Sequence, residues 1–264
     1  RGGVCYTQLE INDAEVMRMK VLFAGETYFV HETHMKGVDY FLQNRYQDDS
    51  GWLRGALEAG GIEVDHIPSH MVPEGFQNAV EALKRYDAVI LSDVGANSLL
   101  LCYDTMAKSI IMPNRLNLLE QFVREGGGLL MVGGYMSFSG IEGRAFFRGT
   151  AIETLLPVEM VPGDDRREVP EGAQIAIERP EHPIFDGIPA KWPKFLGYNR
   201  LIAKPGTQLA SHDGNAFIAA WDYGMGRSAA FASDCAPHWG PEAFVRWEFY
   251  GKFWCNVIRY LAKK

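Results

Sequence analysis

A short glycine-flanked segment near the middle of the chain constrains the fold more than any other feature. It reads Gly126-Gly-Gly-Leu-Leu-Met-Val-Gly-Gly-Tyr-Met-Ser-Phe138. Residues 129–132 are typical of a short buried strand, and the glycine pair at 133–134 lets the backbone turn sharply after it. A strand that breaks at small residues and presents one side chain at its tip is how α/β hydrolytic folds expose a nucleophile. Here the residue at the tip is Tyr135, so the sequence predicts the elbow without its usual reactive atom.

The order of apolar runs predicts a mostly parallel sheet. Runs of strand length lie at 20–24, 62–67 and 87–93, and helical patterns are expected between them at 52–59, 76–86 and 115–125. This alternation is typical of βαβ units. Beyond residue 157, short runs broken by Pro and Gly predict antiparallel strands. Residues 216–221 are expected to pair with 228–232, and an amphipathic helix is expected to follow.

A single domain is predicted over residues 19–264. The first 18 residues lack the basic and apolar regions of a secretory signal. They are interpreted as an N-terminal extension or an artificial remnant, and a genuine edge element remains an alternative.

Composition narrows the class of partner. The chain has 264 residues, 47% of them hydrophobic, and a net charge of −7. It has no apolar run of roughly 18 residues, and this acidic balance argues against nucleic acid or an anionic membrane as a partner. Its four cysteines form no CxxC pair, which favours a reducing, cytoplasmic location. Dinucleotide, P-loop and GxSxG signatures are missing, so the cofactor stays unknown.

Four segments together resemble the class I glutamine amidotransferase-like family. They are the elbow, Gly-Asp-Asp-Arg at 163–166, Leu-Gly-Tyr-Asn at 196–199 and Ser-Asp-Cys-Ala-Pro-His-Trp at 233–239. More narrowly, these segments resemble a subgroup of bacterial cytoplasmic proteins called "putative glutamine amidotransferases". It implies a three-layer, flavodoxin-like α/β fold, with a mostly parallel sheet and antiparallel additions toward the C-terminus.

The same resemblance bears on the reaction. Members of the wider family hydrolyse glutamine with an elbow cysteine and a His–Glu pair after a late strand. Matched by position, the cysteine falls on Tyr135, and the histidine falls near Asp234 or Cys235, with His238 three residues further on. A phenol with a pKa near 10 is a poor nucleophile. Glutaminase activity by the usual route is therefore not expected.

Polar residues that follow the predicted strands are the candidates for a site. Ligands of open parallel sheets bind at the carboxyl ends of the strands, where such side chains converge. Asp and Asn at these positions also serve as helix caps, which is the competing interpretation. The candidate catalytic residues are Glu26, Asp93, Asp234, Cys235 and His238. The candidate ligand-binding residues are His31, His34, Asn97, Tyr135, Arg166, Tyr198 and Asn199.

Three of these motifs have two interpretations each. Cys235 is either a thiol activated by His238 or a buried, inert side chain. His31 and His34 would share one face of a helix and could join a metal set, although no metal site is predicted. Arg166 lies either in a solvated charged turn or in a lid that pairs with a substrate carboxylate or phosphate.

The functional hypotheses belong to three classes. The first is an enzyme that acts hydrolytically on a small polar metabolite, and it predicts that Glu26, His31, Asp93 and His238 converge in one cleft. The alternative is a non-catalytic protein that binds a small ligand, including a carbohydrate, as in related trehalose-utilisation-type proteins. The third is a structural or assembly subunit with its tryptophans on an exposed patch. A homo-oligomer is compatible with all three.

Overall fold

A central eight-stranded sheet organises the protein, whose computed structural model describes residues 19–264. Five neighbouring strands are parallel, in the order β4 (Glu63–Ile67), β1 (Lys20–Gly25), β5 (Ala88–Ser92), β6 (Gly128–Val132) and β14 (Gly226–Phe231). Three antiparallel strands extend the sheet: β13 (Asn215–Tyr223), β12 (Gln208–His212) and β9 (Ala176–Ile177). The predicted parallel sheet with late antiparallel additions is confirmed, including the pairing of β13 with β14.

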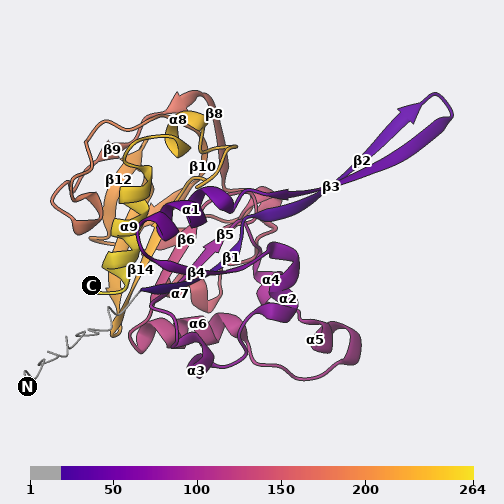
Figure 1. Cartoon of the computed structure of the whole chain (residues 1–264), viewed down its shortest axis with the longest axis horizontal. Coiled ribbons are helices and arrows are strands. Elements are labelled where there is room, and N and C mark those ends of the chain that lie inside the picture. Colours follow the sequence, from indigo (N-terminus) through magenta and orange to yellow (C-terminus); the bar gives the residue numbers. More distant parts are fainter. Residues whose placement is uncertain (1–18) are drawn as a thin grey trace, which may run out of the picture.

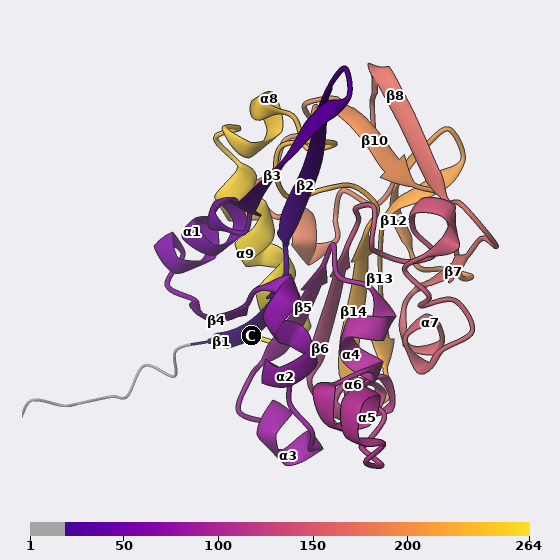
Figure 2. The same ribbon diagram turned by 90° about the vertical axis from the view of Figure 1, so that its right-hand side faces the viewer.

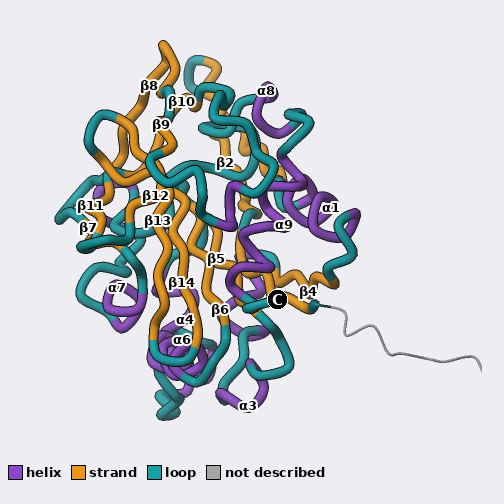
Figure 3. Tube along the Cα trace, turned by 90° about the vertical axis from the view of Figure 1, so that its left-hand side faces the viewer, coloured by secondary structure: helices purple, strands orange, loops and turns teal. Residues whose placement is uncertain are grey.

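Helices cover both faces of this sheet. On one face lie α1 (Gly51–Ala59) and α9 (Tyr250–Leu261), which contact each other, and on the other lies α6 (Arg115–Arg124) (Figure 2). Every residue of β5 and β6 is buried, because these central strands are covered on both sides. The result is a three-layer α/β fold, which Figure 3 shows from the opposite side.

The remaining elements are short, apart from one pair of long strands. The helices are η1 (Ser69–Met71), α2 (Val72–Gly75), α3 (Val80–Leu83), α4 (Ala96–Leu100), α5 (Tyr103–Lys108), η2 (Ile141–Gly143), α7 (Ala151–Leu155), η3 (Pro183–Phe185) and α8 (Glu242–Val245). The strands are β2 (Thr27–Lys36), β3 (Asp39–Asp48), β7 (Val158–Met160), β8 (Arg166–Ala173), β10 (Phe195–Asn199) and β11 (Leu201–Ala203).

The helix expected at 76–86 is largely wrong. Within that range the chain forms only the single turn α3, and Phe76, which follows the turn α2, is extended. Asn78 in this gap accepts a hydrogen bond from Arg115 Nε at 2.7 Å. A side-chain contact with α6 therefore anchors this largely non-helical segment.

The sequence did not predict the most prominent feature of the outline, a long hairpin formed by β2 and β3. This hairpin, called the arm below, comprises residues 27–48 and projects away from the sheet (Figure 1). The turn at its tip contains Gly37, whose φ of +67° suits glycine.

No helix within residues 19–264 combines the length and apolarity needed to cross a membrane. The predicted N-terminal extension, residues 1–18, lies outside the described residues. Trp239 and Trp254 are buried, which does not support the exposed tryptophan patch of the third hypothesis.

Candidate active site

A cavity of about 280 Å³ opens at the carboxyl ends of the parallel strands. Residues within three positions of the ends of β1, β5, β6 and β14 contribute to it, and the base of the arm closes one side. It is lined by Glu26, Tyr28, Asp49, Asp93, Tyr135, Asp234, Pro237 and His238. The strand ends of the sheet thus bring together groups that are up to 212 positions apart in sequence.

Glu26 is held at the end of β1 by its neighbour on β5. Its amide donates to the Ser92 carbonyl at 2.9 Å, and the Ser92 hydroxyl donates to its carboxylate. The backbone of Glu26 has a φ of +58°, and that of Asp93 a φ of +44°. Left-handed backbone at non-glycine residues is uncommon and tends to collect at functional sites. Here it lies at two adjacent strand tips that carry carboxyl groups.

Gly134 allows two more carboxylates to approach the elbow. A Cβ atom at this position would lie 2.7 Å from Asp93 Oδ1 and 3.0 Å from Asp234 Oδ1. Its φ of +141° is a second reason for glycine. Asp93 Oδ1 in turn accepts from the Met136 amide at 2.6 Å. The elbow is therefore built closely around the two acids.

Asp234 and His238 form a hydrogen-bonded pair in the same cavity. His238 Nδ1 lies 3.1 Å from Asp234 Oδ2, which also accepts from the Trp239 amide at 3.1 Å. The imidazole packs edge-on against the Tyr135 ring, with centroids 4.7 Å apart. Asp234 is buried while about half of the His238 side chain is exposed. The carboxylate orients an imidazole that remains open to the cavity.

Tyr135 occupies the tight turn after β6, as predicted, but its hydroxyl is engaged. It donates to Glu168 Oε1 at 2.9 Å, and Trp239 Nε1 donates to the other oxygen of Glu168 at 2.9 Å. Arg166 lies over the Tyr135 ring at 5.1 Å. The pKa of Tyr135 is raised above its usual 10, chiefly because the phenol is partly buried and secondly because it is hydrogen-bonded to Glu168. The phenol at the elbow is a hydrogen-bonded wall of the cavity.

Burial and mutual repulsion shift the carboxyl groups toward their neutral forms. The pKa of Glu26 lies well above its usual value, chiefly because the group is buried and secondly because Asp234 and Asp93 are nearby. Burial, then the charge of Asp234, raises the pKa of Asp93 from 3.8 to about 6. Burial also raises the pKa of Asp234. The hydrogen bond to Asp234 raises the pKa of His238 above 6.5. These groups therefore hold their protons to higher pH than the same groups in water.

Asn199 braces the elbow from behind. Its amide group accepts from the Gly134 amide at 3.0 Å and donates to the Gly134 carbonyl at 3.1 Å. It also donates to Asp165 Oδ1 at 2.8 Å, and Asp165 accepts from the Ser139 and Gly140 amides. Asn199 is fully buried and does not line the cavity. The structure places it as a support of the elbow, not as the predicted ligand contact.

The two arm histidines lie outside the cavity. His31 and His34 are on β2, not on a helix, and a spacing of three residues places them on opposite faces of a strand. His31 bonds Asn44 at 2.7 Å, while His34 stacks on Phe41. Within residues 19–264, no three His, Cys, Asp or Glu side chains are grouped to hold a metal ion. The expected convergence of His31 with the acids is therefore wrong.

Four other candidates also do not line the cavity. Cys235 is completely buried, and burial raises its pKa well above 9, which opposes a thiolate role. Asn97 is exposed on α4, and Tyr198 is buried, with its ring against His212. Arg166 is paired with Asp164 at 2.8 Å, so its guanidinium is already engaged by a carboxylate of the chain.

The cavity also contains residues that the sequence did not indicate. Tyr28 and Asp49 enter from the two ends of the arm, where the Asp49 amide donates to the Glu26 carbonyl at 3.1 Å. Pro237 belongs to the segment that carries His238. Tyr28 and Asp49 become neighbours only when residues 27–48 fold back as a hairpin, and Gly37 was the available turn signal.

The parallel sheet, the elbow after β6 and the cavity at the strand ends define an α/β protein of the class I amidotransferase-like type. A family model described as "Putative glutamine amidotransferase" matches residues 20–263, so the chain belongs to this family. No curated protein matches the chain.

Two solved structures from Salmonella typhimurium are similar over most of the chain. Cytoplasmic protein STM1381 from strain LT2 is 43% identical, with a TM-score of 0.89. Cytoplasmic protein STM3548 is 39% identical, also with a TM-score of 0.89. In both comparisons, the match covers 92% of this chain and 99% of the other.

Proposed function

We propose that this protein is a hydrolase that acts on a small polar molecule by acid–base catalysis, with water as the nucleophile. The observation that carries the proposal is that Asp93 and the Asp234–His238 pair open onto one cavity. Neither the thiol nor the phenol near the elbow suits the role of nucleophile, because Cys235 is buried and the Tyr135 hydroxyl is bonded to Glu168. We therefore assign the role of nucleophile to a water molecule activated by Asp93.

The pKa shifts suggest how protons move. Asp93, with a pKa of about 6, is mostly ionised at pH 7 and suits a general base. It takes a proton from water as the water oxygen bonds to the electrophilic carbon of the substrate. His238, whose pKa is raised by the hydrogen bond to Asp234, gives a proton to the leaving oxygen or nitrogen as that atom's bond to carbon breaks. One water is consumed, and exchange with solvent restores both groups.

The charge of the cavity favours a neutral or cationic substrate. Glu26, Asp93, Asp234 and Asp49 all line it. An anionic substrate would meet repulsion in a partly desolvated space. A cavity of about 280 Å³ suits a small molecule with hydroxyl, amide or amino groups. The carboxylate of glutamine fits this environment poorly, which agrees with the replacement of the elbow cysteine by Tyr135.

Binding without turnover is the second candidate function, and the aromatic wall favours it. The rings of Tyr28 and Tyr135 line the same cavity as the carboxyl groups. An apolar surface beside a few converging polar groups is typical of small-ligand sites. A carbohydrate, which presents both apolar faces and hydroxyl groups, is the ligand class that would match.

Substitutions at the two proposed proton carriers test the hydrolase. The purified protein would be incubated with a panel of neutral and cationic glycosides, amides and esters, and products would be measured by mass spectrometry. Asp93→Asn and His238→Gln are each expected to lower turnover by about 10²–10⁴-fold. His212→Gln serves as the matched control, because His212 lies on β12 outside the cavity.

The pH profile gives an independent check. The rate is expected to rise near pH 6 as Asp93 ionises and to fall above pH 6.5 as His238 loses its proton. Product formation that survives both substitutions would refute the assigned roles. A ligand that binds the wild type and is never converted would establish the binding function instead.

A cytoplasmic location in a bacterium is part of the proposal. The two Salmonella relatives are named as cytoplasmic proteins, and the cysteines of this chain form no CxxC pair. These observations support a protein that works on soluble metabolites. The acidic composition gives no support for nucleic acid or a membrane as a partner.

A further inference from the structure

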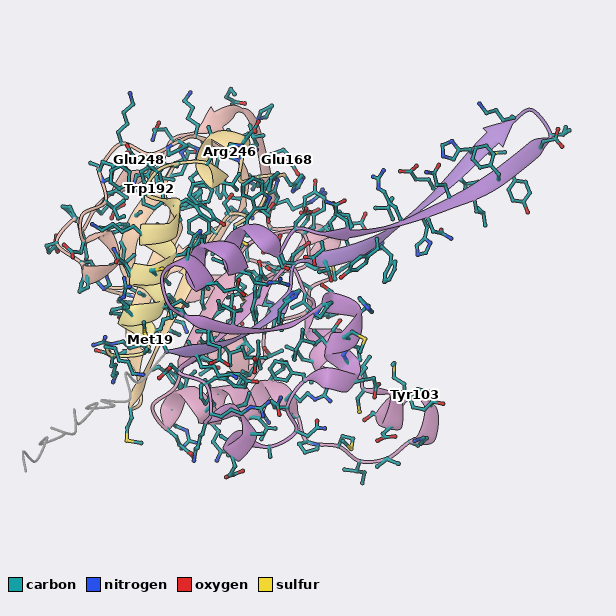
Figure 4. All side chains as sticks on the ribbon, viewed as in Figure 1. Met19, Tyr103, Glu168, Trp192, Arg246 and Glu248 are labelled. Atoms are coloured by element: carbon teal, nitrogen blue, oxygen red, sulfur yellow. The ribbon has the colours of Figure 1, made fainter. Side chains whose placement is uncertain are left out.

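The arm has little support from the rest of the described chain. Strands β2 and β3 pair with each other over ten positions, and within residues 19–264 neither joins another strand. Side chains along most of its length stand in solvent (Figure 4). Isolated two-stranded hairpins are only marginally stable in water. Such a long ribbon is therefore expected to be covered by something else.

The two faces of the arm differ in charge. Cross-strand pairs share a face, and successive pairs alternate between faces. One face carries all four charged residues from position 29 to 46, including the ion pair of Arg45 with Glu32 at 3.3 Å. The other, called the uncharged face, consists of Phe29, His31, Thr33, Met35, Tyr40, Leu42, Asn44 and Tyr46.

The uncharged face exposes large apolar side chains. Met35 is 76% exposed, Tyr40 68% and Leu42 65%. Near the base, Phe29 and Tyr46 contact the ring of His70 on η1 and are still about half exposed. Monomeric proteins rarely leave contiguous apolar patches of this kind uncovered.

We propose that the uncharged face of the arm packs against a second copy of this chain. Two copies that each carry a net charge of −7 repel one another, and a face without charge is where they can meet at the least electrostatic cost. A face lacking Lys and Arg is also poorly suited to nucleic acid or to an anionic membrane. A two-fold arrangement would cover both arms at once.

The available area is sufficient for such a dimer. Aromatic side chains bury about 150–250 Å² each, so the exposed parts of the five large side chains offer on the order of 600 Å² per copy. A pair would bury about 1,200 Å², the lower limit of a stable interface.

A second apolar segment lies on the same side of the molecule. Around α5, Ile111 is 97% exposed, Met106 59% and Tyr103 55%. Both the arm and α5 project from this side (Figures 1 and 2), and Tyr103 is labelled there in Figure 4. The partner copy would therefore find apolar surface beyond the arm itself.

The test measures mass in solution with variants at adjacent positions of β3. The wild type is expected to have twice the 29.6 kDa chain mass by light scattering at micromolar concentration. Leu42→Lys places a charge on the uncharged face and should weaken the dimer at least about 100-fold. Gln43→Lys adds the same charge to the opposite face, across from Glu32, and should leave the dimer intact.

Met35→Lys repeats the test near the tip of the arm, and circular dichroism verifies that each variant is folded. A monomeric wild type would overturn the proposal. So would a dimer that survives both Leu42→Lys and Met35→Lys, because it would then use another surface. Equal dissociation by Gln43→Lys would also overturn it, because the two faces would not differ.

Discussion

The cavity and the arm are adjacent in the chain, because Glu26 lines the cavity and the arm starts at residue 27. The cavity buries polar groups that are usually exposed, and the arm exposes apolar groups that are usually buried. At the end of β1, Glu26 is buried although it is a carboxylic acid. A few residues later, Met35 and Leu42 are exposed although they are apolar. Each departure costs free energy, and such departures tend to coincide with function. The cavity keeps carboxyl groups away from bulk water, whereas the arm keeps apolar side chains in water.

The two regions also differ in how firmly they are held. The cavity is fixed by bonds from several elements, such as Ser92 to Glu26 and Asn199 to Gly134. The arm depends on its own ladder and on contacts at its base with His70. We therefore expect substitutions that disturb the packing around the cavity to lower stability strongly and matched substitutions in the arm to lower it little.

The largest contrast is expected for two Gly→Ala substitutions. Gly134→Ala forces a Cβ to within 3.0 Å of two carboxylate oxygens at a φ of +141°, and should lower the free energy of unfolding by about 3 kcal/mol or more. Gly37→Ala has open space around it and a φ of +67°, and should cost about 1 kcal/mol. Urea denaturation measures both. Equal losses would show that the elbow is not tightly packed around its acids.

Removing the charge of Asp93 is expected to change the free energy of unfolding by a smaller amount. Its pKa is about 6 in the folded protein and about 3.8 unfolded, so its contribution to stability is present below pH 3.8 and is lost as pH rises through 6. Asp93→Asn removes this dependence while its amide oxygen can still accept from Met136. The variant should be more stable than wild type by about 1–3 kcal/mol at pH 8.

Urea denaturation at pH 4 and pH 8 would check this difference. The two proteins should differ by only about 0.5 kcal/mol at pH 4, where Asp93 is protonated in the folded state and roughly half ionised in the unfolded state. A variant that is less stable than wild type at pH 8 would contradict the raised pKa. It would show instead that the carboxylate is well solvated or paired in the fold.

The central sheet and the elbow could be predicted because their strands consist almost entirely of apolar residues, which is typical of buried strands. β5 and β6 are continuous apolar runs, and Gly133 and Gly134 mark the turn that follows. The rule that ligands gather at parallel strand ends then selected Glu26, Asp93, Asp234 and His238, which do line one cavity. Their catalytic roles remain predictions.

The arm could not be predicted because no core imposes a pattern on it. One face of β2 and β3 mixes charges with His34 and Phe41, and the other is apolar yet exposed, so the usual inside–outside alternation is lost. Tyr28 and Asp49 were missed for the same reason, because they reach the cavity only through the arm. Asn199 was misassigned because its sequence context does not show that its amide faces Gly134.

The smallest effect on the free energy of unfolding is expected when an exposed side chain of the arm is truncated. Leu42→Ala removes a side chain that is 65% exposed, so the free energy of unfolding should change by no more than about 0.5 kcal/mol. The same truncation at Leu130, buried in the centre of β6, should cost about 2–5 kcal/mol. Both are measured by urea denaturation at a protein concentration low enough to avoid association, because a dimer would add its binding energy to the result. A loss above about 2 kcal/mol for Leu42→Ala, typical of a core position, would mean that the arm packs into the fold of its own chain. That result would remove the contrast between the two regions and the reason for expecting a partner.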